Sequence, residues 1–95
     1  MEAPHLLVVD DDARIRSLLV RYLRGQGFLV TAARDAAQAR RLLAGLAFDL
    51  LVLDVMMPGE DGVSLLAALR RRGDATPALL LTAKAETDDR IAGLE

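Results

Sequence analysis

The sequence contains no cysteine and no tryptophan, and only 3% of its residues are aromatic. Without cysteine the chain forms neither a disulfide bond nor a thiolate metal site, and this composition suits a reducing compartment. Because aromatic residues are so few, the core has to be built from leucine, valine and alanine. The hydrophobic content of 53% is enough for such a core.

Excess charge and long apolar runs are also missing. The formal net charge of −2 argues against a general nucleic-acid-binding surface. No apolar stretch approaches the roughly 18 residues that a membrane-spanning helix needs. The length of 95 residues is sufficient for one small domain. We therefore expect a soluble, cytoplasmic domain that contacts no membrane and does not itself bind nucleic acid.

Short apolar runs alternate with stretches of helical periodicity. Strands and helices that alternate at these lengths predict right-handed βαβ units, and hence an α/β fold with a doubly wound parallel sheet. Asp12 and Asp35 are suited to cap the first two helices. The expected strands are residues 5–10, 28–32, 48–54 and 77–82, and the expected helices are residues 12–24, 35–46, 62–72 and one that starts at Thr87 or Asp88. The apolar stripes that should be buried are Ile15, Leu18, Leu19, Tyr22 and Leu23 on the first helix, and Val63, Leu66 and Leu69 on the third.

Carboxylates stand at the ends of two expected strands. Asp10 and Asp11 follow the first strand, and Asp54 ends the third. Ligands of open α/β sheets bind outside the carboxyl ends of the strands, so we expect these side chains to meet. Mg²⁺ prefers oxygen ligands and takes only one or two carboxylates from a protein. We predict a magnesium site with Asp11 and Asp54 as direct ligands, Asp10 reaching through water, and the backbone carbonyl of Met56 as a further ligand.

The same site is suited to phosphoryl transfer. A carboxylate can act as a nucleophile and form an acyl phosphate, and a bound cation offsets its repulsion from an anionic phosphoryl group. We assign the nucleophile to Asp54. Thr82 ends the fourth strand on the same rim, where its hydroxyl could donate to a phosphoryl oxygen on Asp54. Since that bond would exist only after phosphorylation, Thr82 is a candidate switch residue.

Three motifs, in this order and at these spacings, resemble the receiver domain of bacterial two-component response regulators. They are Val8-Val9-Asp10-Asp11-Asp12, the segment from Leu53 to Gly62, and Leu81-Thr82-Ala83-Lys84. The segment from Leu81 to Glu95 is similar to the winged-helix transcription-factor branch. The resemblance implies a flavodoxin-like (CheY-like) sheet, Mg²⁺ at the acidic site, and phosphorylation of Asp54 by a sensor histidine kinase. It also implies that the chain is a phosphoaccepting signalling domain rather than a turnover enzyme, and that it controls an output domain, a DNA-binding one, absent from this chain.

Members of that family continue for about 25 further residues beyond the length of this chain. We therefore expect residues 1–95 to be a receiver domain that is incomplete at its C-terminus, with strand order 2-1-3-4 and with strand five and helix five missing. The strand Pro77–Thr82 would then be an exposed apolar edge, which is a template for pairing. An exposed edge and a bare sheet face predict a homodimer, one whose elements could be intertwined.

Two other functions are compatible with these residues. The first is a phosphorylation-incompetent, truncated receiver that acts as an interaction or dimerisation fragment. The second is an aspartate-nucleophile phosphatase, which usually carries a second acid two residues after the nucleophile. Met56 occupies that position.

Overall fold

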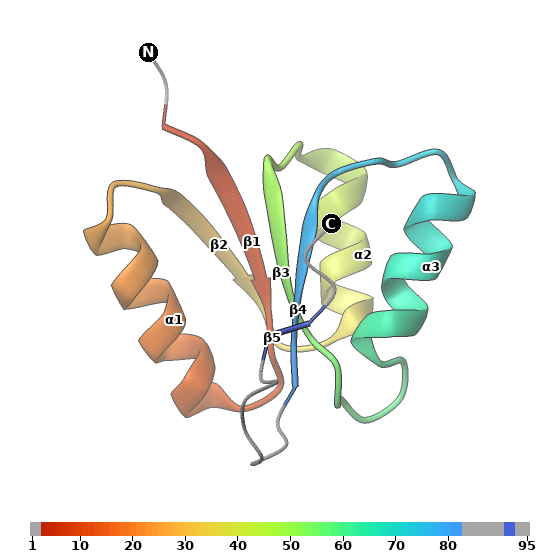
Figure 1. Ribbon diagram of the computed structural model, residues 1–95, viewed down its shortest axis with the longest axis horizontal. Helices are drawn as coiled ribbons and strands as arrows, with labels where there is room; N and C mark the ends of the chain where they lie inside the picture. Colours follow the sequence, from red (N-terminus) through yellow and green to blue (C-terminus); the bar gives the residue numbers. More distant parts are fainter. Residues whose placement is uncertain (1–2, 83–90, 93–95) are drawn as a thin grey trace.

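The computed structural model describes residues 3–82 and 91–92, which form a sheet with helices on both faces (Figure 1). The sheet order is β2-β1-β3-β4-β5. The strands are β1 (His5–Val9), β2 (Leu29–Ala33), β3 (Leu50–Asp54), β4 (Ala78–Leu81) and β5 (Ile91–Ala92). The helices are α1 (Ala13–Gly25), α2 (Ala36–Gly45) and α3 (Gly62–Arg71).

The first four strands are parallel and confirm the predicted order 2-1-3-4. Each is joined to the next by a helix, as a parallel sheet requires. Val9 pairs with both Ala33 and Leu53, which brings the ends of β1 and β3 to the same edge of the sheet. This register places Asp10 next to Asp54.

The outer edge of β4 differs from the prediction. Strand β5 runs antiparallel to β4, with Leu81 paired to Ile91 and Leu80 paired to Ala92. The edge is therefore partly paired within the chain itself. The start of the predicted fourth helix, at Thr87 or Asp88, lies outside the described residues, but its continuation through Ile91 is wrong because that residue is in a strand. The unpaired backbone groups of β4 are satisfied better by a strand than by a helix at this position.

Alternate residues of the strands serve two different hydrophobic layers. Helices α2 and α3 cover one face, where Leu7, Leu53 and Leu69 are completely buried. On the other face Val8, Val30 and Val52 pack against partly buried residues of α1. Figure 1 shows this division, with α1 on one side of the strands and α2 and α3 on the other. No helix in the described part of the chain is long and apolar enough to cross a membrane.

Each helix in the described residues is preceded by an aspartate that caps it. The Asp12 carboxylate accepts from the backbone N–H of Arg14 at 2.9 Å, and the Asp35 carboxylate accepts from that of Gln38 at 2.8 Å. Both caps were predicted. Asp61 caps α3 in the same way, through the N–H of Ser64 at 2.7 Å. A capping carboxylate satisfies one of the free N–H groups at a helix start, so these residues set where the helices begin.

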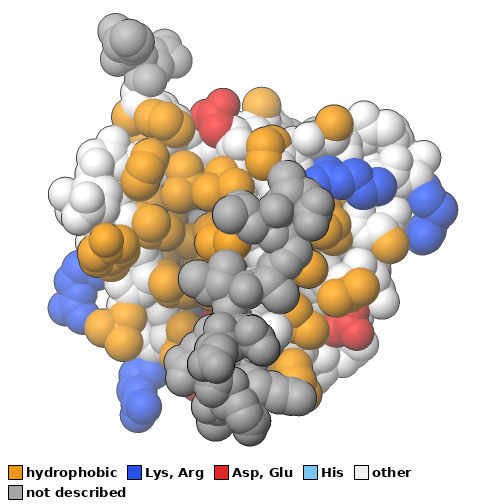
Figure 2. Space-filling model, in the orientation of Figure 1, with side chains coloured by type: hydrophobic (Ala, Val, Ile, Leu, Met, Phe, Trp, Pro, Cys, Tyr) orange, Lys and Arg blue, Asp and Glu red, His pale blue; other side chains and the backbone are white. Residues whose placement is uncertain are grey.

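The predicted stripes on the helices are only partly buried. On α1, Ile15, Leu18 and Tyr22 are 43%, 55% and 64% exposed. This prediction was wrong because periodicity identifies an apolar face but not whether a neighbour covers it, and in the described residues α1 is the only helix on its face of the sheet. Figure 2 shows hydrophobic side chains gathered over the central strands beside α1.

Helix α3 is rotated relative to its predicted stripe. Leu65 and Leu69 are completely buried, Leu66 is partly buried, and Val63 is half exposed. The prediction for Val63 was therefore wrong. Its place on the buried side is taken by Leu65, because the packing of Gly62 against β3 sets the rotation of the helix.

Candidate functional site

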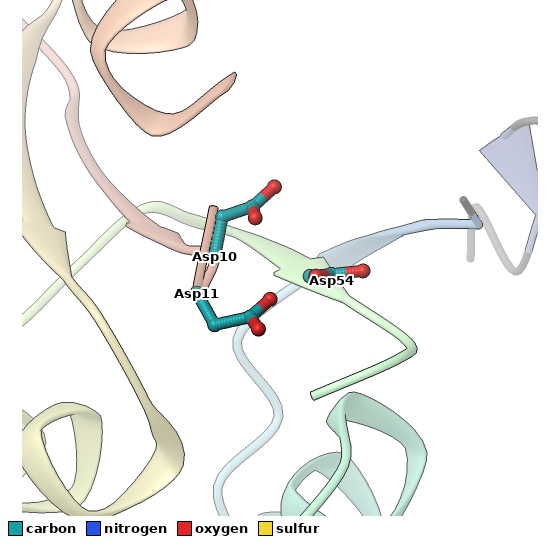
Figure 3. Close-up of side chains that lie close together, drawn as sticks. All are labelled: Asp10, Asp11 and Asp54. Atoms are coloured by element: carbon teal, nitrogen blue, oxygen red, sulfur yellow. The ribbon is translucent and has the colours of Figure 1, made fainter. Parts of the chain in front are cut away.

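Asp10, Asp11 and Asp54 come together at the carboxyl ends of β1 and β3 (Figure 3). One carboxylate oxygen from each residue lies within 4.8 Å of the other two. Figure 3 shows the three side chains extending to the same side of the strand ends. The cluster predicted from the strand-end positions is therefore present as a geometric unit.

Two of the three carboxylates are buried. Asp10 is 4% exposed and Asp54 is 7% exposed, whereas Asp11 is open to solvent. Burial raises the pKa of Asp54 to about 7, and the negative charges of Asp10 and Asp11 act in the same direction, against the opposing effect of a hydrogen bond from Met56. Burial also raises the pKa of Asp10. Repelling carboxylates with open coordination suit a hard divalent cation, so the donor set fits Mg²⁺.

Backbone groups hold two of the carboxylates in place. The N–H of Asp12 donates to Asp10 Oδ1 at 2.9 Å, and the N–H of Met56 donates to Asp54 Oδ1 at 3.1 Å. Each bond spans two residues, so the turn that follows each strand also orients the last carboxylate of that strand. The Met56 N–H is thus placed beside Asp54, while the predicted role of its carbonyl as a metal ligand stays a prediction.

Arg16 belongs to this region although the sequence did not single it out. Its guanidinium donates to the backbone carbonyl of Asp10 at 2.8 Å, and its backbone N–H donates to the carbonyl of Asp12 at 2.9 Å. The long side chain thus reaches from the first turn of α1 back to the end of β1. A spacing of one helical turn after the Asp12 cap was the signal that could have pointed to it.

Gly62 packs directly on the backbone of Asp54. A Cβ added at Gly62 would overlap the carbonyl oxygen of Asp54 and would lie 3.0 Å from its carbonyl carbon. No side chain fits there without moving the strand end or the helix. The sequence suggested only a turn glycine at this position, but close approach of two backbones is what requires it.

Thr82 directly follows β4, whose last residue, Leu81, pairs with Asp54 in the sheet register. The carbonyl of Leu81 also accepts from the N–H of Val55 at 2.8 Å. The structure therefore places Thr82, which is half-buried, at the same edge as the acidic cluster. Its bond to a phosphoryl group stays a prediction.

Residues 6–95 match the family model described as "Response regulator receiver domain". The chain belongs to this receiver family. The receiver domain is 68% identical over 92 residues to "Protein PetR" of Rhodobacter capsulatus, which covers 97% of this chain and 38% of that protein. It is 44% identical over 95 residues to "Transcriptional regulatory protein PrrA" of Mycobacterium leprae, covering 100% of this chain and 41% of that protein. The chain thus spans about two fifths of the length of these relatives.

A solved structure shares the fold of the receiver domain. The response regulator protein TrrA from Thermotoga maritima, crystallised in complex with Mg(2+)-BeF, aligns with a TM-score of 0.81 at 32% sequence identity. The alignment covers 90% of this chain and 72% of that one. The likeness confirms the CheY-like fold class that was predicted from the motifs.

Proposed function

We propose that this receiver domain accepts a phosphoryl group on Asp54 from a sensor histidine kinase, in a reaction that depends on Mg²⁺. The observation that carries the proposal is the convergence of Asp10, Asp11 and Asp54 at adjacent strand ends. The complex of the Thermotoga maritima regulator with Mg(2+)-BeF is consistent with such a site in a relative.

The carboxylate of Asp54 is the nucleophile. One of its oxygens forms a bond to phosphorus as the bond from phosphorus to the kinase imidazole nitrogen breaks, and that nitrogen keeps the electron pair. The Met56 N–H donates a hydrogen bond to Asp54 Oδ1 at 3.1 Å, and this bond orients the carboxyl group. Mg²⁺, held by Asp10, Asp11, Asp54 and the Met56 carbonyl, would offset the negative charge that the carboxylates and the phosphoryl group bring together.

Phosphorylation is then transmitted through the rim of the sheet. Thr82 donates its hydroxyl to a phosphoryl oxygen on Asp54, and this new bond shifts the end of β4. We propose that the shift controls homodimerisation and an output domain that acts in transcription, as the name of the mycobacterial relative suggests. Because Asp54 is itself modified in the reaction, the domain is a signalling module and not a turnover enzyme. It acts in the cytoplasm.

Intact mass after incubation with Mg²⁺ and acetyl phosphate tests the proposal. We expect one added phosphoryl group on the unmodified domain and none on Asp54→Asn, which keeps the size of the side chain but removes the nucleophile. A chain that gives no adduct while still binding Mg²⁺ would contradict the phosphoacceptor function. Steady hydrolysis of a phosphomonoester would favour the phosphatase alternative instead.

A second function, as an interaction fragment, is favoured by a different observation. Ile15, Leu18 and Tyr22 expose apolar surface along α1. Exposed patches of this kind mark association surfaces. Sedimentation that gives the same dimer with and without a phosphoryl group on Asp54 would support it, whereas a dimer that forms only after phosphorylation would support the switch.

A further inference from the structure

We propose that Arg40 and Glu60 form a positioning pair that fixes the loop between β3 and α3, and that this loop position sets the affinity of the acidic site for Mg²⁺. The inference rests on the proposed function, because it concerns the same metal site. The loop, residues 55–61, contains Met56, whose backbone is proposed to bind the metal. Neither member of the pair belongs to the acidic cluster, so both would act through the loop.

Two hydrogen bonds join Arg40 to Glu60, and together they fix the relative orientation of the two side chains as well as their separation. Arg40 Nε donates to Glu60 Oε1 at 2.9 Å, and Arg40 Nη2 donates to Glu60 Oε2 at 2.5 Å. A guanidinium and a carboxylate joined side by side lock their planes together, which a single contact would not do. Arg40 projects from the middle of α2, so the pair ties the loop to a helix that packs on one face of the sheet.

The loop is secured at its ends by other contacts. At the start, the N–H of Val55 donates to the Leu81 carbonyl at 2.8 Å, and that of Met56 donates to Asp54. At the far end, Asp61 caps α3 through the N–H of Ser64. Between these anchors lie Pro58 and Gly59, both exposed, and Gly59 has a φ of +79°. Glu60 follows directly and carries the tie to α2.

Within the loop, Met57 is buried in the core, whereas Pro58 and Gly59 are exposed. An open hollow of about 400 Å³ lies between the loop residues Pro58 and Gly59 and the first turn of α2. Arg40 and Glu60 line the same hollow, and their ion pair crosses it. The ion pair spans this hollow and adds a second anchor, beside buried Met57, for the part of the loop that follows it.

The charges persist over the pH range in which the site would work. The hydrogen bond from Arg40 lowers the pKa of Glu60, and the bond to Glu60 raises the pKa of Arg40. Both side chains are half-buried, so the pair is partly screened by solvent and a moderate effect is expected. Losing it should loosen the loop without unfolding the domain.

Three variants and one control test the pair. Glu60→Gln and Arg40→Gln each remove one charge and keep the side-chain length or polarity, and the charge-exchanged double variant Arg40→Glu with Glu60→Arg restores opposite charges. Arg41→Gln is the matched control, because it removes a cation from the exposed neighbouring position of the same helix. Mg²⁺ affinity is measured by calorimetry, and the adduct rate with acetyl phosphate is measured at saturating Mg²⁺.

We expect each single variant to raise the Mg²⁺ dissociation constant roughly two- to fivefold, which is the range that a half-exposed ion pair can supply. The adduct rate at saturating Mg²⁺ should stay close to that of the unmodified domain, since Asp54 is untouched. The charge-exchanged variant should recover at least half of the lost affinity, and Arg41→Gln should bind Mg²⁺ normally. This split between affinity and maximal rate is not expected from a general loss of stability.

Amide hydrogen exchange in the absence of Mg²⁺ provides an independent readout. The N–H groups of Met56 and Gly62, which bond to Asp54 and Val55, should exchange several times faster in both single variants than in Arg41→Gln. Unchanged Mg²⁺ affinity in the single variants overturns the positioning role, even if exchange is faster. Failure of the proposed function has a different signature, namely no adduct on Asp54 in the unmodified domain while Mg²⁺ still binds.

Discussion

The two faces of the sheet are built from alternate residues of the same strands, yet the helices that cover these faces are buried to different extents. Beneath α2 and α3, leucines of the strands and of α3 are completely buried. Beside α1, the strand valines are buried but the helix itself has no fully buried residue. The difference teaches that the strands are protected by their own neighbours, whereas the burial of a helix depends on how many elements share its face.

The largest expected effect comes from matched leucines on the two faces. Leu69 on α3 is completely buried and Leu18 on α1 is 55% exposed. Leu69→Ala should lower the free energy of unfolding by about 2–5 kcal/mol through lost contacts and a cavity. Leu18→Ala should change it by about 0.5 kcal/mol or less. Chemical denaturation of both variants measures this, and equal losses would break the comparison between the faces.

The acidic edge, where both faces end, should be destabilised by its own charge. The pKa of Asp54 is raised to about 7, above its unfolded value of 3.8, so folding favours the protonated form. The contribution of Asp54 to stability is therefore fully present below pH 3.8 and is lost as the pH rises through about 7. In metal-free protein at pH 8, Asp54→Asn should be more stable than the unmodified domain by about 1–3 kcal/mol.

The unmodified domain and Asp54→Asn also supply a control for that prediction. Mg²⁺ should stabilise the unmodified domain by binding its folded state, and should narrow or reverse the gap to Asp54→Asn. Chemical denaturation of both proteins at pH 5 and pH 8, with and without Mg²⁺, gives the free energies of unfolding for this comparison. A stability of the unmodified domain that rises between pH 5 and pH 8 relative to the variant would contradict the assigned pKa direction.

Glycines at helix termini offer a further test of how closely the elements are packed. Gly62→Ala places a methyl group against the backbone of Asp54, so we expect a loss of about 1–3 kcal/mol in the free energy of unfolding. Gly45 ends α2 with no atom within 4 Å of an added Cβ. Gly45→Ala should be neutral or stabilising by about 0.5 kcal/mol. Thermal unfolding of the two variants is sufficient, and a Gly62→Ala protein as stable as Gly45→Ala would disprove the close approach.

The smallest effect on stability should accompany a change in association. Leu18→Gln and Tyr22→Gln make the exposed stripe of α1 polar while keeping residues that favour helices. Unfolding free energies should stay within about 0.5 kcal/mol of the unmodified value. Sedimentation should show weaker self-association at a fixed concentration. Identical sedimentation of both variants and the unmodified domain would show that α1 is not the contact surface.

Much of the fold and the centre of the site were predictable because they depend on local rules. Strand and helix positions follow from hydrophobic periodicity, and the parallel direction of the strands follows from the helices between them. The strand order 2-1-3-4 was predicted from the resemblance to receiver domains. The meeting of Asp10 with Asp54 needs only that the two strands be neighbours. Their burial and the resulting pKa shifts needed the structure.

Other features depend on contacts between distant residues and carried no local signal. Arg40 and Glu60 lie 20 residues apart and meet only because α2 packs beside the loop after β3. The antiparallel pairing of β5 depends on the edge of β4, which lies ten residues earlier in the chain, whereas the predicted helix rested on its expected start at Thr87 or Asp88. The exposure of Tyr22 depends on what else lies over its face of the sheet, which periodicity does not encode.

The contact between Gly62 and the carbonyl of Asp54 also governs motion. No side chain separates the end of β3 from the first turn of α3, so there is no compressible layer between them. A displacement of the Asp54 backbone must therefore be followed by the start of α3 with almost no loss of amplitude. Because α3 is a continuous helix from Gly62 to Arg71, we expect a tilt that starts at Gly62 to give its largest displacement at Arg71.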